Sequence, residues 1–495
     1  MTLGRFFRHS GIYAAGNALN WLGAFLLLPL YTRLLSTAQY GTLETFYAIS
    51  SVVSGILSVG IAHATLRFYF DYKEQADRNA LVSTNFLAAL AISMTGAALV
   101  AAVGDGAVQW VLGGNVPSLA LPIILATLVL ELSSQVCLAY LRARELSIFF
   151  ISLSFAKLVL QCIANTVLLL KFDAGVEGVL AGNFLAVAFG WLVLTGYTLY
   201  RCGLHFQASK LGPVLRYSLP FLYVTVVTVV AANIDRFIIN KLLSLEALGV
   251  FALALKFSKL ISGLIGEPFN RAYGAFRFTM MGRPDAALVQ ARIVRCVLAL
   301  LCFVGLVLTY FTGDVLHLMS NPQYWPAADL MPLLVLAAIV QLLNYPAQTG
   351  ILFNKSTGEL FKISVLQATF AVAIGFPLMW KFGLQGACLA AFLSAVLGVI
   401  LTHRISQRYF PVAYEYRRLG AMAAIAIGFY GLSLPLASLP WNVAVPSKCA
   451  LLGLFVWALL RSPAFDTDER TWIKQAGASI FGKLQGLRPA WRNRP

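Results

Sequence analysis

The sequence predicts an all-α integral membrane protein of about 14 transmembrane helices, arranged as two parallel six-helix lobes plus two C-terminal helices. Three observations predict this class. Of the 495 residues, 59% are hydrophobic and only 12% are charged, whereas a soluble domain carries about 25% charged residues. Fourteen apolar runs are long enough to cross a bilayer, which takes about 20 residues. The chain also matches itself at an offset of 208 residues.

The predicted spans cover almost the whole chain. They run over residues 10–32, 43–63, 81–103, 117–141, 147–170, 177–200, 214–240, 247–267, 292–312, 328–351, 359–380, 384–403, 419–437 and 445–461. The first run is too long for a cleavable signal peptide, and no small-residue cleavage site follows it.

Basic residues predict the orientation of these spans. With the N-terminus placed in the cytoplasm, 28 of the 37 Lys and Arg residues fall on the cytoplasmic side, six on the outer side and three inside spans. Cytoplasmic loops of membrane proteins carry this excess. Both termini are therefore expected in the cytoplasm, and the net charge of +17 needs no nucleic-acid partner.

The internal repeat divides the chain. RLLSTAQYG (33–41) matches KLLSLEALG (241–249), and GVEG (175–178) matches GLQG (383–386). Two copies of six helices, 9–200 and 217–408, then share one orientation, an architecture in which transporters bind substrate between the halves. We expect an N-terminal lobe (1–205), a C-terminal lobe (206–410), two extra helices (411–461) and a basic cytoplasmic tail (462–495).

Ionisable residues in the middle of spans are candidates for function, because burying them in lipid is costly. Glu131 and Lys157 lie at similar depths in consecutive spans, where an ion pair could lock two helices or change partners during transport. Lys256 and Lys259 share one helical face, and a Lys ammonium binds phosphate well. Lys259 could instead extend to the inner membrane surface.

Polar residues near the repeat-equivalent spans 1 and 7 form a second group. Asn17 and Asn20 fall, at the repeat offset, on Thr225 and Thr228. These side chains either hydrogen-bond between helices or line a shared aqueous cavity. Asp235-Arg236 is either a coupling or gating pair or a helix-end anchor.

Catalytic motifs are absent. The sequence contains no G-x-x-x-x-G-K-[ST] loop, nucleophile elbow or zinc-protease motif, and its seven Cys and five His show no ligand spacing. We expect no catalytic residues, no metal site and no cofactor.

Four segments carry a family resemblance. They are PLYTRLLSTAQYG (29–41), RFYFDY (67–72), IDRFIINKLLSLEALGVFALALKF (234–257) and FGLQGA (382–387). The chain resembles the bacterial oligosaccharide flippases (Wzx-like polysaccharide transporters) of the multidrug/oligosaccharidyl-lipid/polysaccharide exporter superfamily. Only Asp235, Arg236 and Arg67 map onto the family by pattern; Lys157, Lys256 and Lys259 are chosen from depth and charge.

The resemblance implies a V of two lobes around a cationic cavity in the cytoplasmic membrane. Such proteins move undecaprenyl-diphosphate-linked oligosaccharides to the outer leaflet, where they enter O-antigen, capsule or exopolysaccharide. We expect alternating access between the lobes, driven, since no ATP motif is present, by a Na⁺ or H⁺ gradient or by consumption of the product outside. The resemblance also implies a monomer. We expect contacts with membrane lipids, a polysaccharide polymerase and chain-length machinery.

Three alternatives remain open. A peptidoglycan-precursor flippase also has 14 helices, whereas cation-coupled multidrug exporters typically have 12. A membrane polymerase or ligase generally needs a sizeable outer loop with charged catalytic residues. The longest outer loops here, around 104–117 and 313–327, contain no Lys or Arg.

Overall fold

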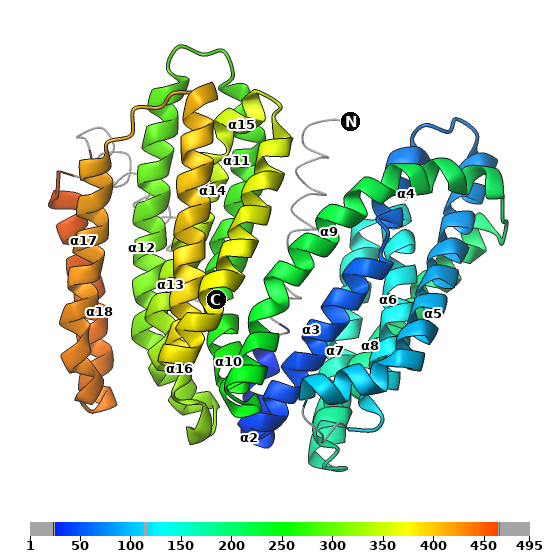
Figure 1. The fold of residues 1–495 in the computed structure, drawn as a ribbon, viewed down its shortest axis with the longest axis horizontal. Helices are drawn as coiled ribbons and strands as arrows, with labels where there is room; N and C mark the ends of the chain where they lie inside the picture. Colours follow the sequence, from blue (N-terminus) through cyan, green and yellow to red (C-terminus); the bar gives the residue numbers. More distant parts are fainter. Residues whose placement is uncertain (1–22, 24, 113–116, 464, 466–495) are drawn as a thin grey trace, which may run out of the picture.

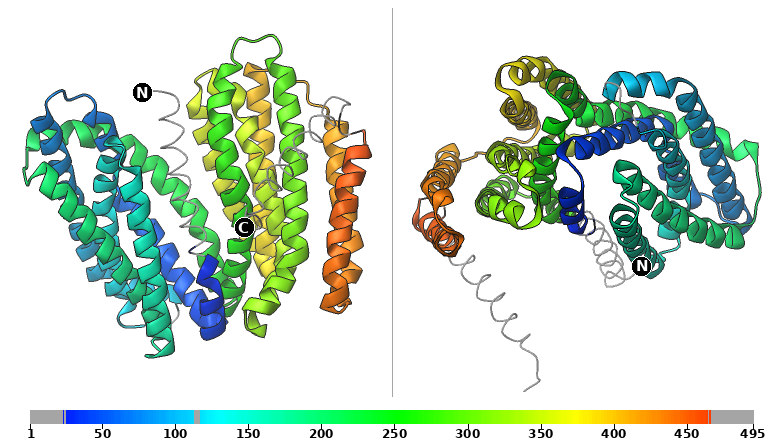
Figure 2. Two further views of the ribbon diagram at one scale, coloured as in Figure 1. Left: turned by 180° about the vertical axis from the view of Figure 1, so that it is seen from behind. Right: turned by 90° about the horizontal axis from the view of Figure 1, so that it is seen from below.

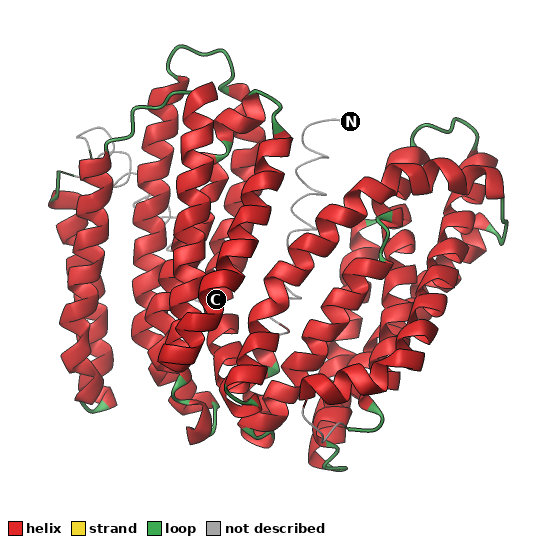
Figure 3. Ribbon diagram, in the orientation of Figure 1, coloured by secondary structure: helices red, strands yellow, loops and turns green. Residues whose placement is uncertain are grey.

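The computed structural model describes residues 23, 25–112, 117–463 and 465, which fold into helices without a strand (Figure 3). Two helical bundles diverge from a common vertex, so that the molecule has the outline of a V (Figure 1). The all-α class with two lobes and two additional helices is confirmed.

The first bundle contains the N-terminal helices that the structure describes. They are α2 (Leu28–Leu34), α3 (Thr37–Leu57), α4 (Ile61–Tyr69), α5 (Gln75–Leu112), α6 (Ala120–Ala143), α7 (Ser147–Leu170) and α8 (Gly175–Cys202). The predicted span 43–63 is a broken helix, because α3 and α4 meet at 45°. Gly60, in the left-handed region with φ 71°, allows the break.

The second bundle follows α9 (Ala208–Leu242), a helix that contacts α3, α4 and α5 as well as α16. Its elements are α10 (Leu245–Ile261), the π-helix η1 (Ser262–Gly266), α11 (Glu267–Thr279), α12 (Ala286–Met319), η2 (Pro322–Tyr324), α13 (Ala327–Leu342), α14 (Asn344–Ala347), α15 (Thr349–Phe353) and α16 (Thr357–Tyr409).

The two extra helices, α17 (Tyr416–Ser433) and α18 (Trp441–Arg461), are joined by η3 (Leu434–Ser438). They stand at the outer edge of the second bundle, away from the first (Figure 2). The Tyr310 hydroxyl on α12 donates to the Phe429 carbonyl on α17 at 2.7 Å, and Lys448 on α18 pairs with Asp314 on α12 at 2.6 Å. Both helices are therefore anchored on α12.

The helices agree with the predicted spans. Among the described residues, ten helices are long and apolar enough to cross a membrane, and the bent pair α3–α4 makes an eleventh. α16 alone contains the two predicted spans 359–380 and 384–403, and the 35-residue α9 contains the span 214–240. Most of the first predicted span, 10–32, lies outside the described residues.

The repeat is visible in the backbone. Gly175 and Gly383, which are 208 residues apart, have φ values of +50° and +58°. Gly175 begins α8, and Gly383 breaks the helical geometry of α16 at the equivalent point. Each six-helix unit thus enters its last helix through a glycine in a conformation that L side chains rarely adopt.

Replacing Gly383 with Ala should therefore destabilise the protein by roughly 1–3 kcal/mol. A Cβ at Gly383 would meet no atom within 4 Å, so the cost is conformational rather than steric. Thermal unfolding of purified protein measures it. The matched control is Gly358→Ala, since Gly358 also has open space around it but lies in the first turn of α16. Equal melting temperatures for the two variants would contradict this reasoning.

The vertex is formed by α3 and α10, the same helix in the two repeats. An ideal Cβ on Gly41 would lie 1.9 Å from the Leu245 carbonyl oxygen, and one on Gly249 would lie 2.1 Å from the Thr37 carbonyl oxygen. Gly249 is 208 residues after Gly41, and Leu245 is 208 after Thr37. The two helices thus touch backbone to backbone through a pair of reciprocal contacts, which we call the glycine contact.

Hydrogen bonds between the lobes surround the glycine contact. The hydroxyl of Tyr324, a fully buried residue, donates to the carbonyls of Leu35 and Ser36 at 3.1 and 3.0 Å. The Arg33 guanidinium donates to the Leu318 carbonyl at 2.7 Å. These bonds join the end of α2 and the start of α3 to the end of α12 and the following η2, and they close this end of the V.

Candidate functional site

A group of charged side chains lies between the lobes, just inside the vertex. Its centre is Glu44 on α3, which is only 3% exposed. Lys256 on α10 places its ammonium 2.6 Å from Glu44 Oε1 and 2.7 Å from the Tyr40 hydroxyl. Arg236 on α9 places Nε 3.7 Å from Glu44 Oε2. One buried carboxylate therefore links both lobes and α9.

Arg236 is held from several directions. Its Nη1 donates to the Ala232 carbonyl at 3.3 Å and to Asn233 Oδ1 at 3.1 Å, and it lies 3.8 Å from Asp235 Oδ1. Its Nε, by contrast, has no hydrogen-bond partner among the described residues. The local Asp235–Arg236 pair foreseen from the sequence is present, and it is part of a larger arrangement.

Lys259 completes the group, which we call the vertex cluster: Glu44, Asp235, Arg236, Lys256 and Lys259. Lys259 is exposed and interacts electrostatically with Arg236, Asp235 and Glu44. Three cations thus face two carboxylates and leave one excess positive charge. Because Lys256 is one-third exposed, the cluster can offer ammonium groups to an anion.

The structure brings together four of the predicted residues, namely Lys256, Lys259, Asp235 and Arg236. Sequence reasoning missed Glu44 and Tyr40 as site residues. Glu44 stands at the edge of the predicted span 43–63, where a charge suggests a membrane surface, whereas α3 begins at Thr37 and buries it. The signal that could have found it is its position three residues after Gly41, the glycine that recurs as Gly249 at the repeat offset.

Other predicted residues lie apart from the vertex cluster. Arg67 ends α4 and pairs with Asp71 at 2.5 Å, with 58% of its side chain exposed. It lies 23 residues after Glu44, beyond the break between α3 and α4. On α9, Thr225 is half-buried and Thr228 is exposed. Asn17 and Asn20 lie outside the described residues.

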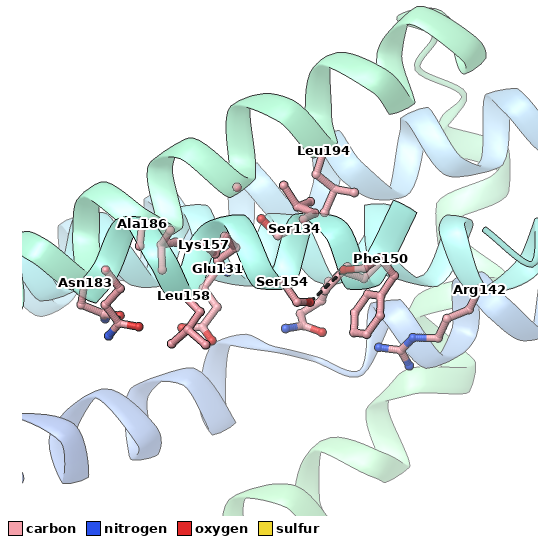
Figure 4. A pocket seen from close by; sticks show the side chains of 16 residues that line it. Glu131, Ser134, Arg142, Phe150, Ser154, Lys157, Leu158, Asn183, Ala186 and Leu194 are labelled. Atoms are coloured by element: carbon pink, nitrogen blue, oxygen red, sulfur yellow. Dashed lines mark hydrogen bonds between the residues drawn. The ribbon is translucent and has the colours of Figure 1, made fainter. Parts of the chain in front are cut away.

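Glu131 and Lys157 line a separate cavity of about 480 Å³ between α6, α7 and α8 (Figure 4). We call it the first-bundle cavity. Each of the two residues lies near the middle of a 24-residue helix, as predicted. No ion pair within 4.0 Å joins them in the part of the chain that the structure describes, so the predicted direct pairing is not what this conformation shows.

A metal site is not visible in the described residues, because no group of three His, Cys, Asp or Glu side chains comes together there.

Comparison with known proteins identifies the family of the chain and solved structures with a similar fold. A family described as "Polysaccharide biosynthesis protein" matches residues 30–281. No protein of curated function matches the chain in sequence. Among solved structures, the chain is similar to the lipid II flippase MurJ in an inward closed conformation. The TM-score is 0.72 at 11% identity, covering 92% of this chain and 99% of MurJ.

Two transporters show the same fold. An inward-facing multidrug resistance MATE family transporter of the MOP superfamily matches with a TM-score of 0.57 and 13% identity, over 79% of this chain and 96% of its own. A MATE protein in the bent conformation matches with a TM-score of 0.54 and 15% identity, over 86% of this chain and 96% of its own. The fold and the matched residues 30–281 agree, and this multi-pass membrane protein belongs to the polysaccharide biosynthesis protein family.

Proposed function

We propose that the chain is a flippase that moves undecaprenyl-diphosphate-linked oligosaccharides from the inner to the outer leaflet of the bacterial cytoplasmic membrane. The units then serve synthesis of O-antigen, capsule or exopolysaccharide. The observation that carries the proposal is the vertex cluster: Lys256, Lys259 and Arg236 outnumber their carboxylates between two lobes, in a family tied to polysaccharide biosynthesis.

A diphosphate suits this cluster for an electrostatic reason. Ammonium and guanidinium groups form short, strong hydrogen bonds with phosphate oxygens. Glu44 holds Lys256 in place before cargo arrives, and the diphosphate competes with that carboxylate for the ammonium. Thr225, Thr228, Asn17 and Asn20 are proposed to hydrogen-bond the sugars as they pass, and Arg67 to attract the anionic headgroup at the open end.

The orientation follows from the basic residues. α4 and the end of α6 pack together away from the vertex, and this end carries Arg67, Arg142 and Arg144. By the excess of Lys and Arg in cytoplasmic loops, the open end of the V faces the cytoplasm and the glycine contact closes the outer side. Both termini are proposed to be cytoplasmic.

Transport is proposed to proceed by alternating access. The polyprenyl tail stays in lipid while the lobes close at the inner end and separate at the glycine contact. Because the sequence has no P-loop for ATP, a Na⁺ or H⁺ gradient, with Asp235 or Glu131 as the coupling group, or consumption of the product outside supplies the drive. The protein is proposed to act as a monomer beside a polymerase and chain-length machinery.

Two other cargoes fit the same fold. The MurJ similarity, at 11% identity, allows a peptidoglycan precursor, and the MATE similarities allow a drug. α17 and α18 favour the lipid-linked cargoes, because the multidrug exporters of this superfamily typically have 12 helices. An enzyme is disfavoured, since the solved structures with this fold are a flippase and transporters.

Deleting the gene and profiling polyprenyl diphosphates by mass spectrometry tests the proposal. One oligosaccharide-linked species should accumulate, and the wild-type gene should clear it. Lys256→Ala should clear it at least about tenfold more slowly, which corresponds to about 1.4 kcal/mol. An unchanged lipid profile would contradict the proposal and favour a drug as cargo, whereas cell lysis with accumulation of the peptidoglycan precursor would identify the other alternative.

A further inference from the structure

We propose that the first-bundle cavity is a saccharide-binding pocket, which holds sugar residues of the cargo while the diphosphate occupies the vertex cluster. The inference rests on the proposed function in one respect: the saccharide is taken to be the one carried on the lipid. The pocket itself is argued from its lining.

The polarity of this cavity distinguishes it from the other hollows of the bundle. Its volume of about 480 Å³ lies within the roughly 300–1,000 Å³ typical of small-molecule sites. Two hollows of about 630 and 610 Å³ are larger, but they are lined almost entirely by apolar side chains such as Met94, Leu125 and Leu215. Of these three hollows among the described helices, the first-bundle cavity is the one that combines amides, hydroxyls and charges.

The uncharged polar groups can both donate and accept hydrogen bonds. Ser134 donates to the Leu130 carbonyl at 2.7 Å, and Ser154 donates to the Phe150 carbonyl at 2.9 Å (Figure 4). The oxygens of both hydroxyl groups therefore remain available as acceptors. Gln161 Nε2 donates to Asn183 Oδ1 at 3.3 Å, which leaves the Gln161 oxygen and the Asn183 amide nitrogen for a ligand. Sugar hydroxyl groups need such a mixed set, because each of them donates and accepts.

Two opposite charges line the cavity without a direct ion pair. Glu131 and Lys157 line the same cavity at mid-helix, yet neither makes a hydrogen bond or an ion pair with the described residues. The two groups attract each other electrostatically, and because no direct hydrogen bond from the described residues satisfies either of them, each can bind a polar atom of a ligand. Gly190 provides space for the lysine: an ideal Cβ there would lie 2.5 Å from Lys157 Cδ.

Other ligand classes fit this lining less well. A divalent cation prefers several carboxylate or carbonyl oxygens, but Lys157 and Arg142 contribute positive charge against the single carboxylate of Glu131. A small anion would be repelled by the Glu131 carboxylate. An apolar drug would leave the amides without partners, which is costly. A polyhydroxylated ring satisfies the amides, the hydroxyls and both charges together.

Affinity capture tests the pocket. The probe is the mixture of free oligosaccharides that mild acid releases from the polyprenyl diphosphates of bacterial membranes, so neither lipid nor phosphate contributes. Immobilised full-length protein in nanodiscs is incubated with the mixture, and mass spectrometry identifies what it retains. Ser154→Phe fills the cavity, and Gln161→Leu removes one amide. Ser152→Phe is the matched control, because Ser152 lies on the same helix but is exposed and outside the lining.

Wild type and Ser152→Phe should retain the same oligosaccharide, while Ser154→Phe and Gln161→Leu should retain it at least about tenfold less. Melting temperatures show which variants are folded. If Ser154→Phe does not fold, the retention by Gln161→Leu decides whether the cavity binds the oligosaccharide. No retention by wild type, or equal retention by Ser152→Phe and a folded cavity variant, would overturn the pocket. If the deletion strain accumulates the lipid but the wild-type protein retains no oligosaccharide, the saccharide pocket is rejected and the flippase proposal stands. If the protein retains an oligosaccharide but the strain accumulates no lipid, the flippase proposal is rejected and the pocket stands.

Discussion

Glu44→Gln should reduce the export of lipid-linked oligosaccharide at least about tenfold and destabilise the purified protein by about 2–4 kcal/mol, as expected when one partner of a buried charge pair is removed. Glu44 is 3% exposed, and Lys256 and Arg236 lie 2.6 and 3.7 Å from its oxygens. Without this carboxylate, only Asp235 faces the three cations. Lipid profiling measures export, and thermal unfolding measures stability.

Glu246→Gln is the control for this variant. Glu246 lies in the first turn of α10, the helix that carries Lys256, but it is exposed. It should therefore export normally. Glu44→Asp should recover part of the function, since it restores the charge on a shorter side chain. Normal export by Glu44→Gln would remove the vertex cluster from the transport mechanism, even if the protein were less stable.

Gly41→Val or Gly249→Val should abolish export by preventing closure at the vertex. A Cβ at these positions would lie 1.9 and 2.1 Å from backbone carbonyl oxygens, and a backbone cannot move aside as a flexible side chain can. The helices α3 and α10 must separate instead, which breaks the interlobe bonds of Tyr324 and Arg33. A double variant should be no worse than either single variant, because one separation relieves both contacts.

Chemical labelling measures this separation directly. Thr32 is fully buried beside the Met319 carbonyl, so Thr32→Cys should resist a hydrophilic maleimide in the wild type and react with it in either glycine variant. Gly196→Val is the control, since a Cβ at Gly196 would meet no atom within 4 Å. Protection of the cysteine in Gly41→Val would show that the vertex accommodates the added side chain.

Most helices could be predicted from sequence, because membrane spans depend on long apolar runs and on little else. The repeat also gave the correct pairing of elements, as Gly175 and Gly383 show. The break between α3 and α4 and the π-helix η1 at Ser262–Gly266 could not be predicted, since neither interrupts hydropathy. Local backbone geometry there depends on packing between helices.

The candidate site was predicted in part. The depth of a residue in the membrane can be estimated by counting residues along its helix. For this reason Lys256, Glu131 and Lys157 could be placed near the middle of their spans. Rotation about the helix axis depends on tertiary packing and could not be counted. For this reason Lys157 was grouped with Lys256, although it faces another cavity, and Glu131 was expected to pair directly with a lysine that the structure holds apart from it.

The glycine contact has the reciprocity of a two-fold homodimer interface. In such an isologous interface, residue i of one subunit touches residue j of the other, and j touches i. Within this single chain, one repeat contributes Thr37 and Gly41 to the contact, and the other contributes Leu245 and Gly249. The two repeats thus correspond to the two subunits of such a dimer. Duplication and fusion of a self-associating six-helix protein would produce this arrangement. The glycine contact would then be a former dimer surface, and the proposed alternating access would require that surface to open and reform in every cycle.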